Sequence, residues 1–459
     1  KSVDYNYSQQ ANRDYILSIY PDCQYRETAN VPAYQDRHSI TLTDQIENYM
    51  SFYATLGYSY ASKYTLSFSF RQDASNKFGQ NTNNRFNPVL SAGIRWNVSE
   101  ENFMRQFGWL SNLTLKASYG SQGKAPDISP YLIANFNIAP DVLTGDQFLS
   151  IKNLPNKDLK WETTTSWNVG FDFGFLKDRI TGSFDYYTRQ TKDLIATVPA
   201  AAGTTFDRNI TTNVGNVDSQ GVEFSLNATP IQTKDWNWDL SFNMTWQKMK
   251  VKNLSLTAGT PATNTSVGPY IDSYQVQTLS EGYAPYMFYV YHQLYDEKTG
   301  KPIEGAYVDL DGDGQINSND LYRYHSPAPD YILGFSTSLR YKKWTLSTSL
   351  RANIGNYVYN AMAMNSGAWE TVSYNSYQLN NLSSTYLKTG FQTRQYLSDY
   401  YVENASFLKM DNLSLGYNFG TIYKGCSLNV SAMVQNVFCI TKYSGVDPEV
   451  PDGVDNSFY

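Results

Sequence analysis

Residues Trp161 to Asp193 read WETTTSWNVGFDFGFLKDRITGSFDYYTRQTKD and carry the clearest structural pattern in the sequence. The first half of this stretch alternates strictly between apolar and polar residues, and the apolar parity consists of Trp167, Val169, Phe171, Phe173 and Phe175. Because successive side chains of a strand point to opposite faces, this pattern predicts a strand with one apolar face. A tight turn at Leu176–Arg179 and a second alternating run complete a β-hairpin. Each run is long enough to cross a bilayer at a tilt, which takes about nine to eleven residues.

The same alternation recurs along the chain and predicts about twelve strands. Besides the two strands of the hairpin, the apolar parity is visible in the runs 52–60 (within a first strand placed at 40–60), 64–70, 90–96, 113–119, 222–228, 236–246, 333–339, 344–350, 413–419 and 428–434. Short turns alternate with long connections, at about 122–160, 194–213, 251–330 and 357–400. An up-and-down membrane barrel has this arrangement, with short periplasmic turns and long extracellular loops. A soluble β-sandwich has no reason to segregate its connections by length.

Aromatic residues gather at the short-turn ends of the expected strands. They are Tyr60, Tyr64, Trp96, Phe173, Phe175, Trp236, Trp238, Tyr341, Trp344, Phe419 and Tyr423. Such a girdle is typical of one membrane–water interface of a barrel. The alternative is the general preference of aromatic residues for strands, which does not by itself place them at one end.

Composition and charge exclude several classes of protein. The 459 residues have a formal net charge of -6 and no basic run with interleaved aromatics, so nucleic acid is not an expected partner. No run approaches the roughly 18 apolar residues of a membrane helix. The sequence contains no HExxH, GxSxG or GxxxxGK[ST] pattern, and neither His292 nor His325 has a nucleophile signature beside it. We therefore do not expect an enzyme.

The segment DLDGDGQINSND, Asp309–Asp320, has the residue spacing of a twelve-residue calcium loop. Hard oxygen ligands at this spacing suit calcium better than zinc. The alternative is a solvated Asp/Gly-rich turn without metal. The expected ligands are Asp309, Asp311, Asp313, Gln315, Asn317 and Asp320.

Several ordered segments together resemble the barrel of SusC-like, RagA-type TonB-dependent outer-membrane transporters. They are Asn153–Ile195, which contains the opening hairpin, and Tyr64–Gly79, Leu110–Gly123, Asn213–Ile231, Asp309–Asp320, Asn404–Gly420 and Gln435–Asn456. The likeness runs from about Tyr49 to the end of the chain.

The resemblance implies an all-β fold, an antiparallel transmembrane β-barrel. Barrels of this class have about 22 strands, so residues 1–459 are expected to be a partial barrel, its C-terminal portion. The family's N-terminal plug domain and first strands are not visible in the sequence, and the family usually has one more strand after the GVDN segment. We expect that such a piece cannot close a barrel alone, because both edge strands would expose unpaired backbone groups to lipid.

The resemblance also implies a function, the TonB-dependent import of glycan or peptide fragments across the outer membrane. Its implied partners are a SusD-like surface lipoprotein, the TonB complex acting through a region preceding this chain, and outer-membrane lipid. The alternatives are an outer-membrane barrel enzyme and a passive porin or adhesin. Aromatic residues of the long loops are candidate substrate contacts; we select Tyr286, Tyr289, Trp369 and Tyr374 from a larger set that includes Tyr283, Phe288 and Tyr291.

Overall fold

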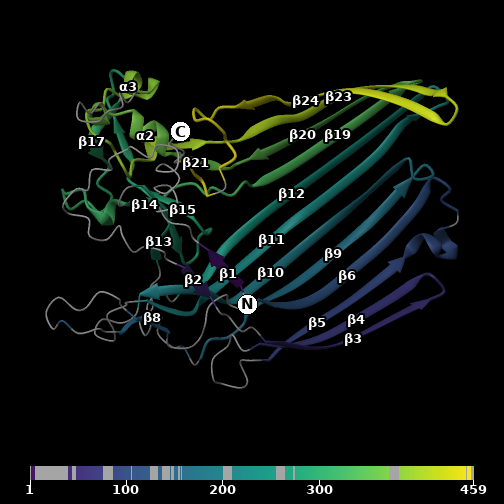
Figure 1. The fold of residues 1–459 in the computed structure, drawn as a ribbon, viewed down its shortest axis with the longest axis horizontal. Coiled ribbons are helices and arrows are strands. Elements are labelled where there is room, and N and C mark those ends of the chain that lie inside the picture. The colour runs from purple at the N-terminus through teal and green to yellow at the C-terminus, as the bar shows by residue number, and fades with distance from the viewer. Residues whose placement is uncertain are drawn as a thin grey trace, which may run out of the picture.

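Twelve antiparallel strands in one curved sheet dominate the computed structural model (Figure 1). The structure describes residues 2–5, 40–43, 48–75, 86–104, 106–124, 133–136, 145, 149–153, 156, 158–199, 209–254, 264–271, 274–371, 382–450 and 452–455. The order in the sheet is β24-β23-β20-β19-β12-β11-β10-β9-β6-β5-β4-β3, so each strand pairs with its neighbours in the sequence. This is the up-and-down arrangement that the alternating sequence predicts.

The strands of the sheet are 11 to 24 residues long. They are β3 (Tyr49–Tyr60), β4 (Tyr64–Ser75), β5 (Phe86–Asn97), β6 (Leu110–Lys124), β9 (Glu162–Phe175), β10 (Ile180–Pro199), β11 (Asn209–Gln232), β12 (Trp236–Leu254), β19 (Tyr331–Tyr341), β20 (Trp344–Ile354), β23 (Phe407–Tyr423) and β24 (Cys426–Thr441). The prediction of about twelve strands is confirmed. Two short 3₁₀ turns, Val98–Glu100 and Asn102–Met104, connect β5 to β6.

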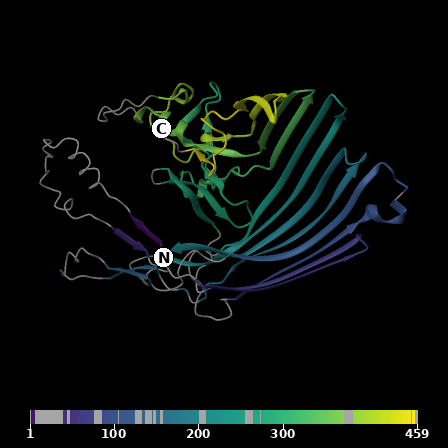
Figure 2. The same ribbon diagram turned by 45° about the vertical axis from the view of Figure 1, so that its right-hand side comes forward.

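The sheet curves into an open trough (Figure 2). Its outer strands β3 and β24 do not pair with each other, and the described strands do not form a closed barrel. The short turns lie at one end of the trough, and most of the long connections gather at the other (Figure 1).

The two faces of the sheet differ as the sequence alternation predicts. A row of apolar residues crosses neighbouring strands in register, with Phe171 opposite Phe184, Phe184 opposite Phe224 and Phe224 opposite Met244. The rings of Phe171 and Phe184 are 5.7 Å apart. We call this apolar side the outer face; side chains at alternate positions form the polar face.

Aromatic side chains border the outer face at both ends. At the short turns, ring centroids are 6.2 Å apart for Tyr64 and Trp96 and 4.2 Å apart for Trp236 and Tyr341, so the expected girdle is present. A second girdle, which the sequence analysis did not identify, lies toward the long connections; we call it the upper girdle, and it comprises Tyr119, Trp167, Tyr186, Trp246 and Tyr331. On β12 the span from Trp236 to Trp246 is about 25 Å tall for a strand tilted by about 40°, which matches the apolar band of membrane barrels.

Two expected boundaries are wrong. The expected strand at 40–60 is two elements, because β2 (Ile40–Thr43) pairs with β1 (Ser2–Tyr5) in a separate sheet and β3 begins at Tyr49. The described residues of the expected loop at 194–213 are strand, because β10 continues to Pro199 and pairs with β11 from Asn209. The strands pair through backbone hydrogen bonds in this region. Its sequence lacks the one-sided apolar pattern from which the other strands were predicted.

The remaining long connections contain secondary structure of their own. The expected loop 122–160 includes the end of β6 and the hairpin β7 (Ile133–Phe136) and β8 (Leu149–Asn153). The elements of segments 251–330 and 357–400, with two later pieces, form what we call the loop assembly: β13 (Asn264–Ile271), β14 (Tyr274–Ser280), β15 (Met287–Val290), β16 (Gln293–Tyr295), β17 (Pro302–Tyr307), η5 (Ser318–Asp320), β18 (Tyr322–Arg323), β21 (Tyr357–Asn360), α2 (Ala361–Ser366), η6 (Trp369–Thr371), α3 (Ser384–Thr389), η7 (Asp399–Tyr401), β22 (Val402–Asn404) and β25 (Val454–Asp455).

The loop assembly has a hydrophobic core of its own. Phe288, Tyr359 and Met364 are fully buried in it, and Phe391 and Tyr401 retain only 1% exposure. These residues come from segments up to 113 positions apart in the sequence, from Phe288 to Tyr401, so the long connections fold together as one unit. Among the described helices, none is both long and apolar enough to span a membrane.

Candidate functional site

Polar contacts connect the two main segments of the loop assembly, 251–330 and 357–400. The Ser398 hydroxyl donates to Oε1 of Gln293 at 2.8 Å, and Nε2 of the same glutamine donates to the carbonyl of Ala306 at 3.0 Å. Nearby, the Asp399 carboxylate lies 2.7 Å from Nδ1 of His292 and accepts a 2.6 Å hydrogen bond from the Tyr322 hydroxyl. Burial and this hydrogen bond to a carboxylate raise the pKa of Tyr322. These contacts join residues 292–322 to Ser398 and Asp399 within the loop assembly.

The pairing of His292 with Asp399 is similar to part of a catalytic constellation, which also needs a nucleophile on the imidazole. In the described chain, the hydrogen bonds of His292 go to Asp399 and, at 3.5 Å, to the Tyr322 hydroxyl. No serine, threonine or cysteine among the described residues bonds to this ring. His325 is stacked on Tyr357 at 3.6 Å between ring centroids, and burial lowers its pKa. The geometry gives both histidines structural contacts between loop segments.

The candidate substrate aromatics fall into different environments. Tyr286 and Trp369 are 49% and 47% exposed, and the Trp369 ring lies 5.9 Å from that of Tyr386. Phe288, by contrast, is fully buried and belongs to the core. Tyr374 lies outside the described residues. The structure therefore presents Tyr286 and Trp369 at the surface and assigns Phe288 to packing.

Tyr289 and Tyr283 come together around a residue that the sequence analysis missed. The guanidinium carbon of Arg323 is 4.6 Å from the ring centre of Tyr283 and 5.6 Å from that of Tyr289. Its Nε is buried without a hydrogen-bond partner, and none of the described carboxylates forms an ion pair with it. An arginine cation near the faces of two aromatic rings is attracted to both, so Arg323 joins the segment 283–289 to β18. An isolated arginine among aromatics carries no spacing signal that could have revealed it.

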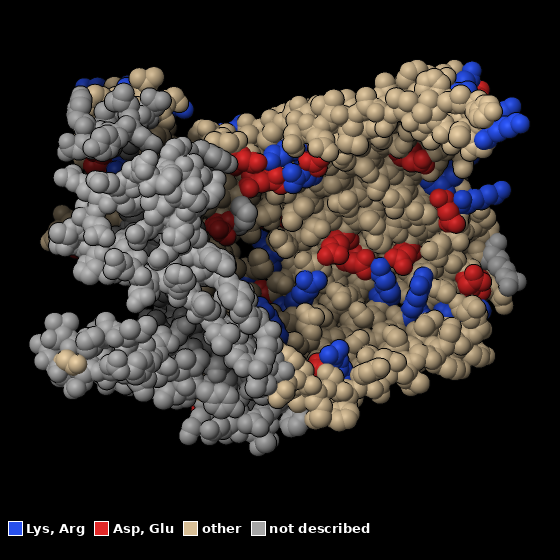
Figure 3. Space-filling model, in the orientation of Figure 1, with Lys and Arg blue, Asp and Glu red and all other residues tan. Residues whose placement is uncertain are grey.

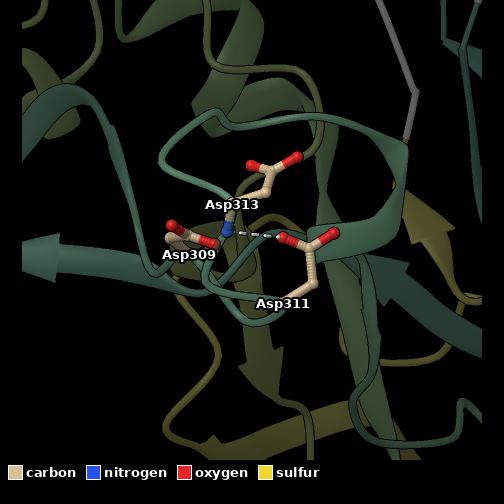
Figure 4. A group of neighbouring side chains, drawn as sticks. All are labelled: Asp309, Asp311 and Asp313. Carbon is tan, nitrogen blue, oxygen red and sulfur yellow. Dashed lines mark hydrogen bonds between the residues drawn. The ribbon is translucent and has the colours of Figure 1, made fainter.

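The acidic loop brings together three of the six expected calcium ligands (Figure 4). Carboxylate oxygens of Asp309, Asp311 and Asp313 lie within 4.8 Å of one another. The Asp309 carboxylate accepts hydrogen bonds from the backbone N–H groups of Gly312 and Gly314, at 2.7 and 2.8 Å, which hold the turn. These oxygens retain lone pairs for a cation, because a carboxylate oxygen can accept more than one contact.

The other three expected ligands have different surroundings. Asn317 donates from Nδ2 to the Asp313 carboxylate at 3.1 Å and, more weakly, to the Gln315 carbonyl at 3.5 Å. Asp320 is buried, and its two oxygens accept backbone hydrogen bonds from Asn317 at 2.8 Å and Leu310 at 2.7 Å. Backbone hydrogen bonds, that from Asn317 foremost, lower the pKa of Asp320. Asp320 thus closes the loop through the backbone.

The polar face of the sheet carries an ionic cluster between the two girdles. Nζ of Lys116 lies 2.7 Å from the Asp172 carboxylate and 3.0 Å from that of Asp185, across three neighbouring strands. Figure 3 shows acidic and basic side chains beside one another over the middle of the visible sheet. Charged groups on this face and apolar groups on the other are what a water-facing lumen and a lipid-facing exterior require.

A family model described as TonB dependent receptor-like, beta-barrel matches residues 1–437 of this chain. The TonB-dependent receptor SusC of Bacteroides thetaiotaomicron is 39% identical over 450 residues, which cover 93% of this chain and 44% of SusC. The TonB-dependent receptor P3 of Formosa agariphila is 30% identical over 459 residues, covering 93% of this chain and 45% of that protein.

Solved structures agree with these relatives. The structure of the RagAB peptide transporter superposes with a TM-score of 0.74 at 26% identity, over 89% of this chain and 45% of that one. The chain therefore spans about half the length of the relatives it matches. With this fold, its two girdles and these matches, the chain belongs to the TonB-dependent receptor family of outer-membrane proteins, as part of the β-barrel.

Proposed function

We propose that this chain forms part of the barrel of a TonB-dependent importer of nutrient oligomers, glycan or peptide fragments, and that it is not an enzyme. The observation that carries the proposal is a membrane wall with a charged polar face, joined at one end to a solid loop assembly. The likeness to SusC and to a structure named as a peptide transporter supports it. The wall encloses the path, and the loop assembly forms its outer mouth.

The importer works with further parts. The edges of β3 and β24 need pairing partners, because lipid cannot satisfy exposed backbone groups. We infer that additional strands of the full-length protein complete the barrel, with a plug domain inside it. A SusD-like lipoprotein covers the loop assembly, and the TonB complex supplies energy through a region that precedes this chain.

Uptake by cells tests the transport role. A strain lacking the full-length protein should fail to grow on one class of oligomer, offered as a panel of glycans and a mixed peptide digest, while growing normally on the corresponding monomers. Inactivating TonB should give the same defect. A passive porin would remain active without TonB, and unchanged growth on every oligomer would reject the importer.

The exposed aromatics of the loop assembly are the proposed substrate contacts. Because aromatic side chains stack on sugar rings and peptide side chains, Tyr286→Ala and Trp369→Ala should weaken binding of the imported oligomer, each by about 1 kcal/mol or about fivefold. Tyr423→Ala, 73% exposed near a short turn, is the matched control. Equal affinity of all three variants in calorimetry would leave these aromatics as packing or partner contacts.

We further propose that Asp309, Asp311 and Asp313 bind calcium and stiffen the loop assembly. The donor set fits, because it consists of hard oxygens and a cation would relieve the repulsion among three neighbouring carboxylates. Gln315 and Asn317 supply further oxygens, and Asp320 fixes the loop around them. Calcium titration by calorimetry should give heat that Asp311→Ala and Asp313→Ala abolish. Asp296→Ala, in another exposed turn of the assembly, is the control; equal heats from all of these proteins would leave a plain turn.

The orientation of the sheet is a separate proposal, with the short turns in the periplasm. In a background with Cys23, Cys426 and Cys439 replaced by serine, Glu297→Cys in the loop assembly should react with an impermeant reagent on intact cells. Lys177→Cys in a short turn should react only after lysis. The opposite labelling pattern would reverse the topology.

A further inference from the structure

Basic residues continue the lipid-facing row of β12 past the upper girdle. The register between β11 and β12 has no shift from Leu240 to Val251, so strict alternation holds along this stretch. Lys248 and Lys250 therefore point to the same side as Phe242 and Trp246. Both lysines are exposed. They lie where the apolar band ends and the lipid headgroups begin.

A contact from the neighbouring strands supports this placement. The hydroxyl of Tyr186, a member of the upper girdle, donates to Oε1 of Gln220 at 3.4 Å. Gln220 is directly opposite Lys248 in the register. Thr188 stands opposite Gln220 on the other side. A polar row therefore sits immediately above the aromatic one on the same face.

A cavity of about 690 Å³ opens beside this row. The strands contribute polar side chains to its lining, and the loop assembly contributes the Tyr283 region and residues just before β19; the lining includes Thr188, Gln190, Gln220, Lys248, Lys250 and Tyr283. Lys252 is neutralised by Asp218 at 3.3 Å. Lys248 and Lys250 form no ion pair with any residue that the structure describes. Two carboxylates also line the cavity, Asp218, which pairs with Lys252, and Asp330.

We propose that Lys248 and Lys250 bind the phosphate of an anionic lipid in the outer leaflet of the outer membrane. Residues two apart on a strand are about 7 Å apart along the chain, so one phosphorylated headgroup reaches both. Lysine ammonium groups bind phosphate as point charges, and Gln220 and Thr188 supply further donors. The outward direction of the two lysines favours a lipid over a substrate in the lumen. This inference goes beyond the proposed transport and rests on the proposed orientation, with the short turns in the periplasm.

Lipid retention by the purified full-length protein tests the site. The protein is reconstituted in neutral phosphatidylcholine with lipid A as a minor component, and bound lipid A is counted by native mass spectrometry. Lys248→Gln/Lys250→Gln should bind lipid A roughly thirtyfold more weakly, since each basic residue near an anionic surface contributes about 1 kcal/mol. Lys177→Gln/Lys234→Gln, with the same charge change in two short turns, is the matched control.

The possible outcomes separate the alternatives. Selective loss in the first double variant, with the control and heat-modifiable barrel migration unchanged, supports the site. Equal retention by both double variants overturns it. Competition by inorganic phosphate alone, at concentrations too low to screen the charges, would also overturn the lipid assignment and leave a free-phosphate site. Measuring import in the same variants separates a failure of the proposed lipid site from a failure of the transport proposal.

Discussion

The twelve-stranded sheet, or membrane wall, and the loop assembly place their large apolar side chains in opposite ways. In the wall, Phe52 of β3 is 60% exposed and Trp167 of β9 is 58% exposed, because the lipid is the medium that receives them. In the loop assembly, Phe288 and Tyr359 are fully buried, because their surroundings are aqueous. Apolar side chains of this one chain are therefore shielded from water in two ways, by lipid in the wall and by other side chains in the loop assembly. The high exposed fractions of apolar side chains in the wall are not a defect of packing.

The largest expected effect is in the core of the loop assembly. Phe288→Ala should destabilise the assembly by about 3–5 kcal/mol, because it removes a fully buried ring and leaves a cavity. Hydrogen exchange of the full-length protein should show faster exchange across β14, β15 and β18, with the wall unchanged. Leu387→Ala, 78% exposed in α3, should have little effect. If Phe288→Ala left the exchange of these strands unaltered, the assembly would not depend on its core.

A smaller effect should separate the two faces of the wall. Phe242→Lys places a charge on the outer face near the middle of the apolar band and should cost about 2–4 kcal/mol. Asn243→Lys, on the next residue and the opposite face, should cost much less because water reaches it. Equilibrium refolding of the full-length protein into lipid measures both. Similar costs for the two neighbours would contradict the assignment of faces.

The smallest expected effect lies at the short-turn end. Glu101 accepts hydrogen bonds from Lys63 Nζ at 2.8 Å, the Tyr64 hydroxyl at 2.6 Å and the Trp96 Nε1 at 3.2 Å. These contacts, the one from Lys63 foremost, lower the pKa of Glu101 from 4.5 to about 2. Because the pKa is lower in the folded state, the stabilisation is present above pH 4.5 and disappears as the pH falls toward 2.

Local hydrogen exchange around the β3–β4 and β5–β6 connections should therefore accelerate on acidification through this window. Glu101→Gln should remove most of this pH dependence, while Glu100→Gln, on the exposed neighbouring residue, should preserve it. An unaltered pH profile in Glu101→Gln would show that the contact does not stabilise this end.

Residue types and their spacing predicted several members of the candidate site, but not how their side chains are arranged in space. The spacing of Asp309, Asp311 and Asp313 indicated a carboxylate group, and the structure places their oxygens together. The spacing also suggested Asp320 as a ligand, and only the structure shows that this residue is buried and accepts backbone hydrogen bonds from Leu310 and Asn317, so its role as a ligand stays a prediction. Lys248 and Lys250 alternate visibly in the sequence, yet their position above the upper girdle depends on the register with β11.

The membrane wall could be predicted from the residues alone, because the alternation in Trp161–Asp193 and its repeats indicates which side of each strand meets lipid. Other features become visible only in the folded molecule. The burial of Phe288, the pairing of Arg323 with two tyrosines and the continuation of β10 through Leu194–Pro199 all depend on contacts between distant segments. Each strand of the wall contacts the same lipid independently of the others, so the local residue pattern is enough to predict which face is apolar. In the loop assembly the surroundings of each residue are other segments of the chain, which a local pattern does not report.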